Sequence, residues 1–580
     1  MKRFLLLTAI LLTGILACRK DDLPSEGDLT LQGYNWGKEM IVSAYGLILD
    51  ESDNPVADAQ VSLGNLSTTT DQNGVFRIRN AQVREKLAQV KVEKSGFFTG
   101  SRSFRPSDNR NPYIRIKLLK KEIAGTFQSG PGGEVVLGSK VSIQFPADAV
   151  STLNGQAYSG EVQVAISYID PTASDLDQRM PGNLLGFREG TGEMGLATFG
   201  MVAVELSGSQ GQPLQLASGK KATLALAVPN SLASTAPANI PLWHYHESIG
   251  IWVEEGEAVL ENGRYIGEVS HFSFWNCDVP YPLVHMEGSV FLDSLGNPFS
   301  GALIRITVLS SSFSGFGFSD EDGLFEGSIP SGEDLLLEIV DLCGVVVYQE
   351  NIGPFGVDVI LDPIIISSGS LTYTPVQVTG TLVDCDGLAV TDGYIKVQAG
   401  QNVAIFQTDP ATGVFDGVFQ ACDSSDFILI GVDETALLQS DTATFTPAPL
   451  VDAGIVSACT VELAEYVKFK MDGVDHLFTE YVSLADSIPG AGFILYAQGI
   501  TQNDRIAIVT PATGLGDFQA LEFGFGFGNY AQDPENIIIM VTEYGPAPGD
   551  VVKGTFSGNY LDSFGNPHEV SGEFKALRDF

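Results

Sequence analysis

Short runs in which apolar and polar residues alternate recur along almost the whole chain. A period of two places successive side chains on opposite faces of a β-strand. The runs are bounded by Gly, Asp, Asn and Pro, which are typical of turns, and the apolar spacing of helices is almost absent. A chain of 580 residues is long enough for several domains with their own cores. The pattern predicts an all-β protein built of serial domains.

Three segments of the chain repeat one order of elements. Each has a strand, a polar turn and a second alternating strand, followed later by an acidic turn with a glycine that leads into an aromatic strand. The segments begin at Gly46, Gly288 and Gly380, and their later turns contain Gly74, Gly323 and Gly413. Tight hairpins need positive φ angles, which glycine adopts without strain. We expect three independent sandwiches in which these turn positions require glycine.

The acidic turns of the repeats have two interpretations, as calcium loops or as ordinary tight turns. They lack the alternating ligands and the closing Glu of an EF-hand. Asp and Asn are common in turns because their side chains bond to nearby backbone amides. Turn chemistry is therefore the favoured interpretation.

The first segment, GLILDESDNPVADAQVSL with its later turn TDQNGVF, closely resembles the carboxypeptidase-regulatory-like domain. The other two segments resemble it more loosely. The resemblance implies a seven-stranded, transthyretin-like β-sandwich that carries no catalytic residues and serves as a structural or binding module. We place three such sandwiches, of transthyretin-like or immunoglobulin-like type, at residues 39–121, 284–366 and 375–460.

The segment at 122–280 differs from the repeats. It contains Gly132-Gly133 before a strand, the element FPADA at 145–149, and a terminal His-Phe-Ser at 271–273. These features resemble the ZU-type β-sandwich, which implies a larger sandwich domain here. Residues 461–580 form a further β-domain by their alternation, and nothing in their sequence predicts its role.

The chain begins MKRFLLLTAILLTGILAC, a positive start followed by a short apolar run. The run is too short for a permanent membrane helix and is typical of a secretory signal. Its end resembles the bacterial lipoprotein signal, which implies cleavage of residues 1–17 and acylation of Cys18. The alternative is an ordinary signal peptide with an incidental cysteine. The polar stretch to residue 38 resembles the tether of Bacteroidetes surface lipoproteins, so we expect an outer-membrane anchor with the protein exposed at the cell surface.

The net charge of −39 is unevenly distributed. Residues 1–121 hold 18 basic and 13 acidic side chains, whereas residues 281–580 hold 8 basic and 41 acidic ones. An acidic surface repels phosphate backbones, which excludes nucleic acid as the expected partner. Motifs for nucleotides, zinc proteases and serine hydrolases are absent from the sequence, so we expect no cofactor and no enzyme activity.

Cysteine and histidine supply the other candidate sites. Apart from Cys18, five cysteines remain and none forms a CxxC pair. A disulfide is expected among Cys385, Cys422 and Cys459, which lie in one repeat. His244 and His246 stand two apart on an expected strand, so they share a face and are weak candidates for metal ligands.

The stretch SHFSFWNC at 270–277 has two interpretations. The first is a core strand, with Phe272 and Phe274 on one face and His271, Ser273 and Trp275 on the other. The second comes from the ZU resemblance, because some such domains cleave themselves between the Phe and Ser of His-Phe-Ser. His271 would then deprotonate Ser273, whose Oγ would attack the Phe272 carbonyl and form an ester that water hydrolyses.

Together these features predict a non-enzymatic, lipid-anchored envelope protein that presents β-sandwich binding modules. Surface glycans or envelope proteins are the expected partners, besides the membrane itself. The alternative class is a self-processing protein cut between Phe272 and Ser273, or an unrecognised surface hydrolase.

Overall fold

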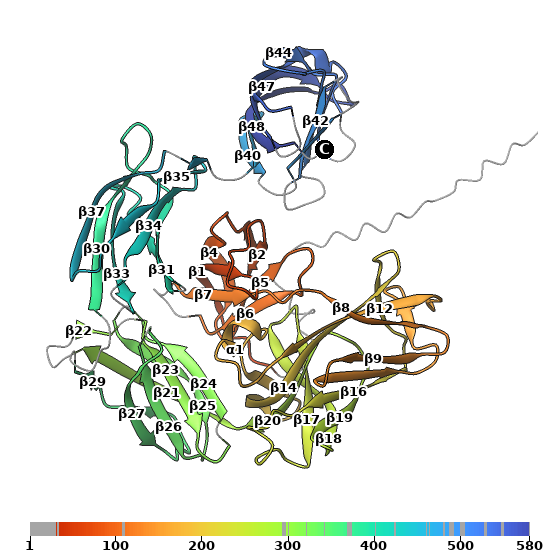
Figure 1. The fold of residues 1–580 in the computed structure, drawn as a ribbon, viewed down its shortest axis with the longest axis vertical. Helices are drawn as coiled ribbons and strands as arrows, with labels where there is room; N and C mark the ends of the chain where they lie inside the picture. The colour runs from red at the N-terminus through yellow and green to blue at the C-terminus, as the bar shows by residue number, and fades with distance from the viewer. Residues whose placement is uncertain are drawn as a thin grey trace, which may run out of the picture.

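The computed structural model describes residues 31–578, except 32–33, 107–110, 293–296, 300, 312, 321, 342, 368–373, 401, 423–424, 460, 463–464, 479–481, 487–491, 499–504, 527–529 and 547–549. In this part of the chain nearly every element is a β-strand, and the four-residue α1 (Leu176–Arg179) is the α-helix. The strands form serial β-domains (Figure 1), of which the first, third, fourth and C-terminal domains each have two sheets. The predicted all-β fold of serial β-sandwiches is confirmed.

The first domain has seven strands in two sheets, with orders β4-β1-β7 and β3-β2-β5-β6. Its strands are β1 (Glu39–Leu49), β2 (Gln60–Leu63), β3 (Leu66–Thr69), β4 (Val75–Arg84), β5 (Ala88–Glu93), β6 (Gly100–Phe104) and β7 (Tyr113–Lys117). Alternate residues of both sheets, among them Val61, Phe76 and Val90, fill one buried core between them.

The third and fourth domains repeat the central strand arrangement of the first. In each, the opening strand pairs antiparallel with the aromatic strand and parallel with a late strand, as β1 pairs with β4 and β7. The third domain contains β21 (Leu283–Leu292), β22 (Asn297–Pro298), β23 (Leu303–Val308), β24 (Phe313–Phe318), β25 (Leu324–Pro330), β26 (Leu335–Val340), β27 (Val346–Ile352), β28 (Val359–Ile360) and β29 (Ile364–Ile366). The fourth contains β30 (Thr374–Val383), β31 (Gly393–Ala399), β32 (Asn402–Gln407), β33 (Val414–Ala421), β34 (Phe427–Asp433), β35 (Leu438–Gln439), β36 (Ala443–Phe445), β37 (Leu450–Ser457) and β38 (Val461–Glu462).

The acidic turns of the repeats are held by their own backbone. Oδ1 of Asp71 accepts the amides of Asn73 and Val75 at 2.9 and 3.0 Å. The equivalent Asp320 and Asp409 likewise accept amides of the residues that follow them. These oxygens fix tight turns, in agreement with turn chemistry.

The turn glycines occupy one structural position in all three repeats. The φ angles of Gly74, Gly323 and Gly413 are 72°, 74° and 69°. A Cβ atom at Gly74 would lie 2.4 Å from the carbonyl oxygen of Ile48, in the opening strand. A Cβ atom at Gly323 would lie 2.3 Å from the carbonyl oxygen of Val290, and one at Gly413 would lie 2.3 Å from that of Leu382. Glycine is required at this position for two reasons. The φ angle is positive, and the opening strand leaves no room for a Cβ atom.

We expect Gly74→Val to destabilise the first domain by about 1–3 kcal/mol, because it combines strain at positive φ with a clash. Gly96→Val is the matched control, since Gly96 has a φ of 83° but open space where its Cβ would lie. Hydrogen exchange in β1 and β4 of a protein that comprises residues 19–580 measures the change. Equal loss in both variants would show that the contact with Ile48 contributes nothing.

The second domain is a single curled sheet of thirteen strands. They are β8 (Ile123–Gln128), β9 (Gly133–Leu137), β10 (Val141–Phe145), β11 (Val150–Thr152), β12 (Glu161–Ile169), β13 (Leu185–Arg188), β14 (Gly192–Gly208), β15 (Pro213–Leu216), β16 (Ala222–Ala227), β17 (Asn239–His246), β18 (Ile251–Glu261), β19 (Arg264–Val269) and β20 (Phe274–Tyr281). Strand β20 lies between β14 and β17 in the middle of this sheet. Core clusters pack on both faces of β20, so Phe274 to Asp278 are buried whichever way they point.

The C-terminal domain has sheets of six and four strands, ordered β40-β39-β48-β47-β46-β44 and β41-β42-β43-β45. They contain β39 (Tyr466–Met471), β40 (Val474–Phe478), β41 (Ser483–Asp486), β42 (Phe493–Gln498), β43 (Arg505–Thr510), β44 (Gly516–Gln519), β45 (Glu522–Phe525), β46 (Ile537–Tyr544), β47 (Val551–Leu561) and β48 (Pro567–Leu577), with the 3₁₀ turn η2 (Pro534–Asn536) before β46. One apolar core joins the two sheets.

The first domain packs against the second. Phe98 and Leu119 belong to a buried cluster that also contains Trp243 and Trp252. The buried hydroxyl of Tyr245 accepts hydrogen bonds from Gln89 Nε2 at 2.8 Å and Ser101 Oγ at 2.9 Å. Apolar burial and satisfied polar groups together make this a fixed interface.

The first domain also packs against the fourth, far along the sequence. A shared apolar cluster joins them, consisting of Leu47, Leu49, Val75, Tyr394, Ile405, Ile430 and Val432. The fully buried Tyr394 donates its hydroxyl hydrogen to Asp71, and Arg77 forms ion pairs with Glu434 at 2.5 Å and Asp392 at 3.1 Å. The expectation of independent sandwiches is therefore wrong for these two domains, although each has a core of its own.

The four domains consequently form a closed frame. The second and third domains touch through Phe199 and Phe313, whose rings are 4.8 Å apart. A disulfide between Cys343 and Cys422 links the third to the fourth. Figure 1 shows the first domain between the second and the fourth, and the C-terminal domain at one end of the long axis.

Candidate functional site

A surface groove of about 370 Å³ lies at one end of strands β17 and β20 in the second domain. It is lined by His244, Tyr245, His246, Glu247, Ser248, His271, Phe272 and Ser273. Both predicted histidines and the whole His-Phe-Ser sequence therefore meet in one place. The sequence had suggested two separate kinds of chemistry for these residues.

Two histidines of the groove converge on one carboxylate. Nδ1 of His244 is 3.2 Å from Oε2 of Glu255, and Nε2 of His271 is 3.3 Å from the same oxygen. The two imidazole rings are 4.7 Å apart at nearly a right angle. His244 comes from β17, Glu255 from β18 and His271 from the bend before β20, so three neighbouring elements each supply one group.

The register of the hairpin explains how Glu255 reaches His244. His244 pairs with Val253, and the register shifts between Pro241 and Trp243. Alternation along β18 returns the side chain of Glu255 to the face of Val253 and His244. Glu255 was not among the predicted site residues, although pairing the two strands of WHYHESIGIWVEE across their turn brings it beside His244.

The electrostatics of the groove follow from this arrangement. Hydrogen bonds from His244 and His271 hold the pKa of the Glu255 carboxyl well below its usual range. Burial lowers the pKa of His246, and the nearby His244 lowers it further.

His244 and His246, predicted as weak candidates for metal ligands on one face, both line the groove, and of the two it is His244 that faces Glu255. Their rings are 6.3 Å apart, and both line the groove from the same face of β17. Nδ1 of His246 is 3.2 Å from Ser248 Oγ instead. The neighbours of His244 are His271 and Glu255.

The interpretation of SHFSFWNC as one continuous strand is wrong at its start. Strand β20 begins at Phe274, and residues 270–273 form a bend. The bend breaks the alternation, so Phe272 packs beside the cluster that contains Trp275 while Phe274 belongs to the opposite one. Both faces of the strand are buried because one apolar cluster packs on the side of Trp275 and Cys277 and another on the side of Phe274.

His271, Phe272 and Ser273, the residues of the cleavage hypothesis, line the groove. The hydrogen bonds of His271 and Ser273 are made with other residues. His271 faces Glu255, and Ser273 Oγ donates to the carbonyl of Phe274 at 3.2 Å. Among the described residues, non-glycine positive φ angles do not include Phe272 or Ser273. Nothing in this geometry positions His271 to deprotonate Ser273, and we expect the chain to remain uncut here.

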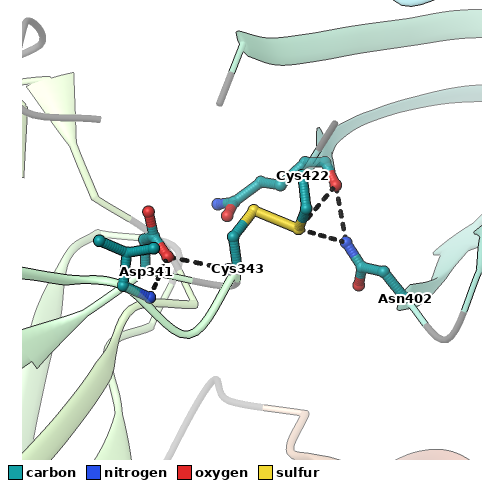
Figure 2. Close-up of a disulfide and its surroundings, with 6 residues drawn as sticks. Asp341, Cys343, Asn402 and Cys422 are labelled. Atoms are coloured by element: carbon teal, nitrogen blue, oxygen red, sulfur yellow. Dashed lines mark hydrogen bonds between the residues drawn. A yellow bond between two sulfur atoms is a disulfide. The ribbon is translucent and has the colours of Figure 1, made fainter. Parts of the chain in front are cut away.

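The cysteines form two disulfides. Cys385 pairs with Cys459 within the fourth domain, whereas Cys422 pairs with Cys343 of the third. Figure 2 shows this second bond crossing between two domains, with Asn402 donating to Cys422 Sγ at 3.8 Å. Cys343 was not among the cysteines expected to pair, because it lies in another repeat. Cys277 is free and buried, and burial raises the pKa of its thiol.

The predicted lipidation site, Cys18, lies outside the described residues. Among the residues that the structure describes, no helix has the length and apolar character needed to span a membrane.

Comparisons with known proteins give distant matches. No family model matches the chain. Human cartilage intermediate layer protein 2 is 25% identical over 219 residues, 36% of this chain and 19% of that protein. Mouse cartilage intermediate layer protein 1 is 22% identical over 250 residues, covering 40% and 21%. The chain thus matches only about a fifth of the length of these curated relatives.

Solved structures with some similarity are also distant. The shaft pilin SpaA of Lactobacillus rhamnosus GG is 9% identical, with a TM-score of 0.20, over 31% of this chain and 97% of the pilin. The Bacillus anthracis TIE protein is 10% identical, with a TM-score of 0.15, over 73% of this chain and 68% of that one. Because these TM-scores are low, the solved structures add nothing to the fold that this chain's own structure shows.

Proposed function

We propose that the protein is a non-enzymatic, lipid-anchored component of a bacterial cell envelope that holds a binding module away from the outer membrane. The observation that carries this proposal is the closed frame of the first four domains. Neighbouring domains of one chain commonly move relative to one another unless their interface is large and apolar. Here the first domain is buried against the second and the fourth, and a disulfide joins the fourth domain to the third. A frame of this kind is suited to a rigid spacer.

The disulfides support a location outside the cytoplasm. Such bonds persist in oxidising compartments such as the periplasm and the cell surface. The lipoprotein-like sequence that ends at Cys18 supplies the anchor in this proposal. The transthyretin-like resemblance of the repeats is in keeping with structural modules that carry no catalytic residues.

The module that the frame presents is the C-terminal domain, at one end of the long axis (Figure 1). Residues 461–580 carry 17 acidic and 6 basic side chains, and this negative charge repels phosphate-rich partners. Surface glycans or envelope proteins are the partners that the proposal assigns to it.

Two assays on the purified ectodomain test this proposal. We expect it to bind components of a glycan array or of isolated envelope, and a version that ends after residue 465 to lose that binding. The shorter version retains both disulfides and the whole frame, so it is the matched control. Turnover of polysaccharide or peptide substrates by the intact ectodomain would contradict the non-enzymatic assignment.

A further inference from the structure

We propose that His244, Glu255 and His271 bind one divalent transition-metal ion of the Zn²⁺ class. This site lies in the second domain, and it is independent of the lipid anchor and of the C-terminal module. The donor atoms are Nδ1 of His244, Nε2 of His271 and a carboxylate oxygen of Glu255.

The spacing of the three donors fits a tetrahedral ion. Zn²⁺ binds His nitrogen and carboxylate oxygen at about 2.0–2.2 Å, so two ligands at a tetrahedral angle lie about 3.4 Å apart. The nitrogen atoms of His244 and His271 lie 3.2 and 3.3 Å from Oε2 of Glu255. All three donors lie within 4.8 Å of one another. Small side-chain adjustments are enough to admit the ion.

Rigid elements hold these ligands in place. His244 and Glu255 stand on paired strands in the middle of the thirteen-stranded sheet. The bend that carries His271 is fixed by Trp275, whose buried ring donates from Nε1 to the His271 carbonyl at 3.0 Å. Ser270 donates to the other carboxylate oxygen of Glu255 at 2.5 Å. Outer hydrogen bonds of this kind orient the ligands of metal sites.

The donor set and the open groove favour a zinc-like ion over calcium or magnesium. Two imidazoles and one carboxylate suit zinc, copper, nickel or cobalt, whereas calcium and magnesium prefer oxygen ligands alone. Three protein ligands leave a fourth position for a further donor, and two of these ligands, His244 and His271, line the groove. With one ionised carboxylate, a divalent ion keeps a positive charge there and attracts water or an anionic donor.

A second cluster provides a comparison within the same chain. His285 Nε2 lies 3.5 Å from Glu287 and 3.6 Å from Glu326. This cluster offers one nitrogen donor, and the side chain of Glu287 is half exposed. Its looser geometry makes His285→Ala the matched control for loss of a histidine beside two acidic groups.

Titration of the metal-free ectodomain with Co²⁺ and then Zn²⁺ tests the site. Four-coordinate Co²⁺ gives a visible absorption band, and Zn²⁺ should displace it at one ion per chain. Loss of an outer-shell partner costs about 10–100-fold in metal affinity, so His271→Ala and Glu255→Gln should each weaken binding more than about 100-fold. His285→Ala should bind as the wild type does.

Circular dichroism checks that each variant is folded. Glu255→Gln is included because it changes the shape of the side chain least. The proposal is overturned if the wild type gives no four-coordinate band and no calorimetric binding of Zn²⁺. It is equally overturned if His271→Ala and folded Glu255→Gln retain full affinity, or if binding is lost in His285→Ala.

Discussion

Replacing Cys385 and Cys459 together by Ser is expected to remove about 4.5 kcal/mol from the stability of the fourth domain. The bond closes a loop with a sequence separation of 74 residues, and chain-entropy arguments assign that magnitude to such a loop. Cys385 follows β30 and Cys459 follows β37, so the bond fastens the ends of a parallel strand pair. Domains are stable by only about 5–15 kcal/mol, so a loss of this size is about a third to nine-tenths of the stability of a typical domain.

Hydrogen exchange of the ectodomain in β30–β37 is the measurement for this variant. The matched control replaces Cys343 and Cys422, whose bond has a similar separation of 79 residues but joins two domains. We expect fast exchange throughout the fourth domain in the first variant. In the control, the core of the fourth domain should stay protected. Unchanged protection after loss of Cys385 and Cys459 would contradict the assignment.

The fold class could be predicted from the sequence because alternation and turn residues are local signals. Gly74 and its two counterparts mark one turn in three repeats, and the structure places all three against the opening strand. Interfaces between domains have no such local signal. The apolar residues Leu47 and Tyr394 look like ordinary strand residues, and only the tertiary arrangement shows that they belong to one buried cluster.

Disulfide pairing also depends on three-dimensional proximity, which cysteine spacing does not determine. Cys422 lies in the same repeat as Cys385 and Cys459, yet its partner is in the preceding domain. The position of Cys343 in its repeat gave no indication of this.

The candidate site was predicted in fragments. His244 and His271 were both singled out, but for different chemistries, because they are 27 positions apart in the sequence. Their meeting depends on β17 and β20 being neighbours, which alternation cannot predict. The bend at 270–273 also could not be foreseen, because its residues continue the apolar and polar pattern of the strand.

Cys18→Ser is expected to abolish lipid attachment and to remove the protein from the outer-membrane fraction. Each buried CH₂ of an acyl chain contributes about 0.8 kcal/mol, and stable anchoring takes two membrane signals. Loss of the acylated thiol removes every chain at once. Metabolic labelling with a tagged fatty acid, followed by membrane fractionation, measures both effects. Cys277→Ala is the matched control, since that thiol is buried in the second domain, and it should keep label and location. Label retained by Cys18→Ser would place the lipid elsewhere.

The central claim is that the chain acts as an intact, lipid-anchored envelope protein. The intact mass of the protein purified with detergent from its own cells tests this claim most directly. We predict one species that begins at Cys18, carries two or three acyl chains, and has no cut between Phe272 and Ser273. A species that begins at another residue without lipid, or a pair of fragments divided at Ser273, would contradict the account.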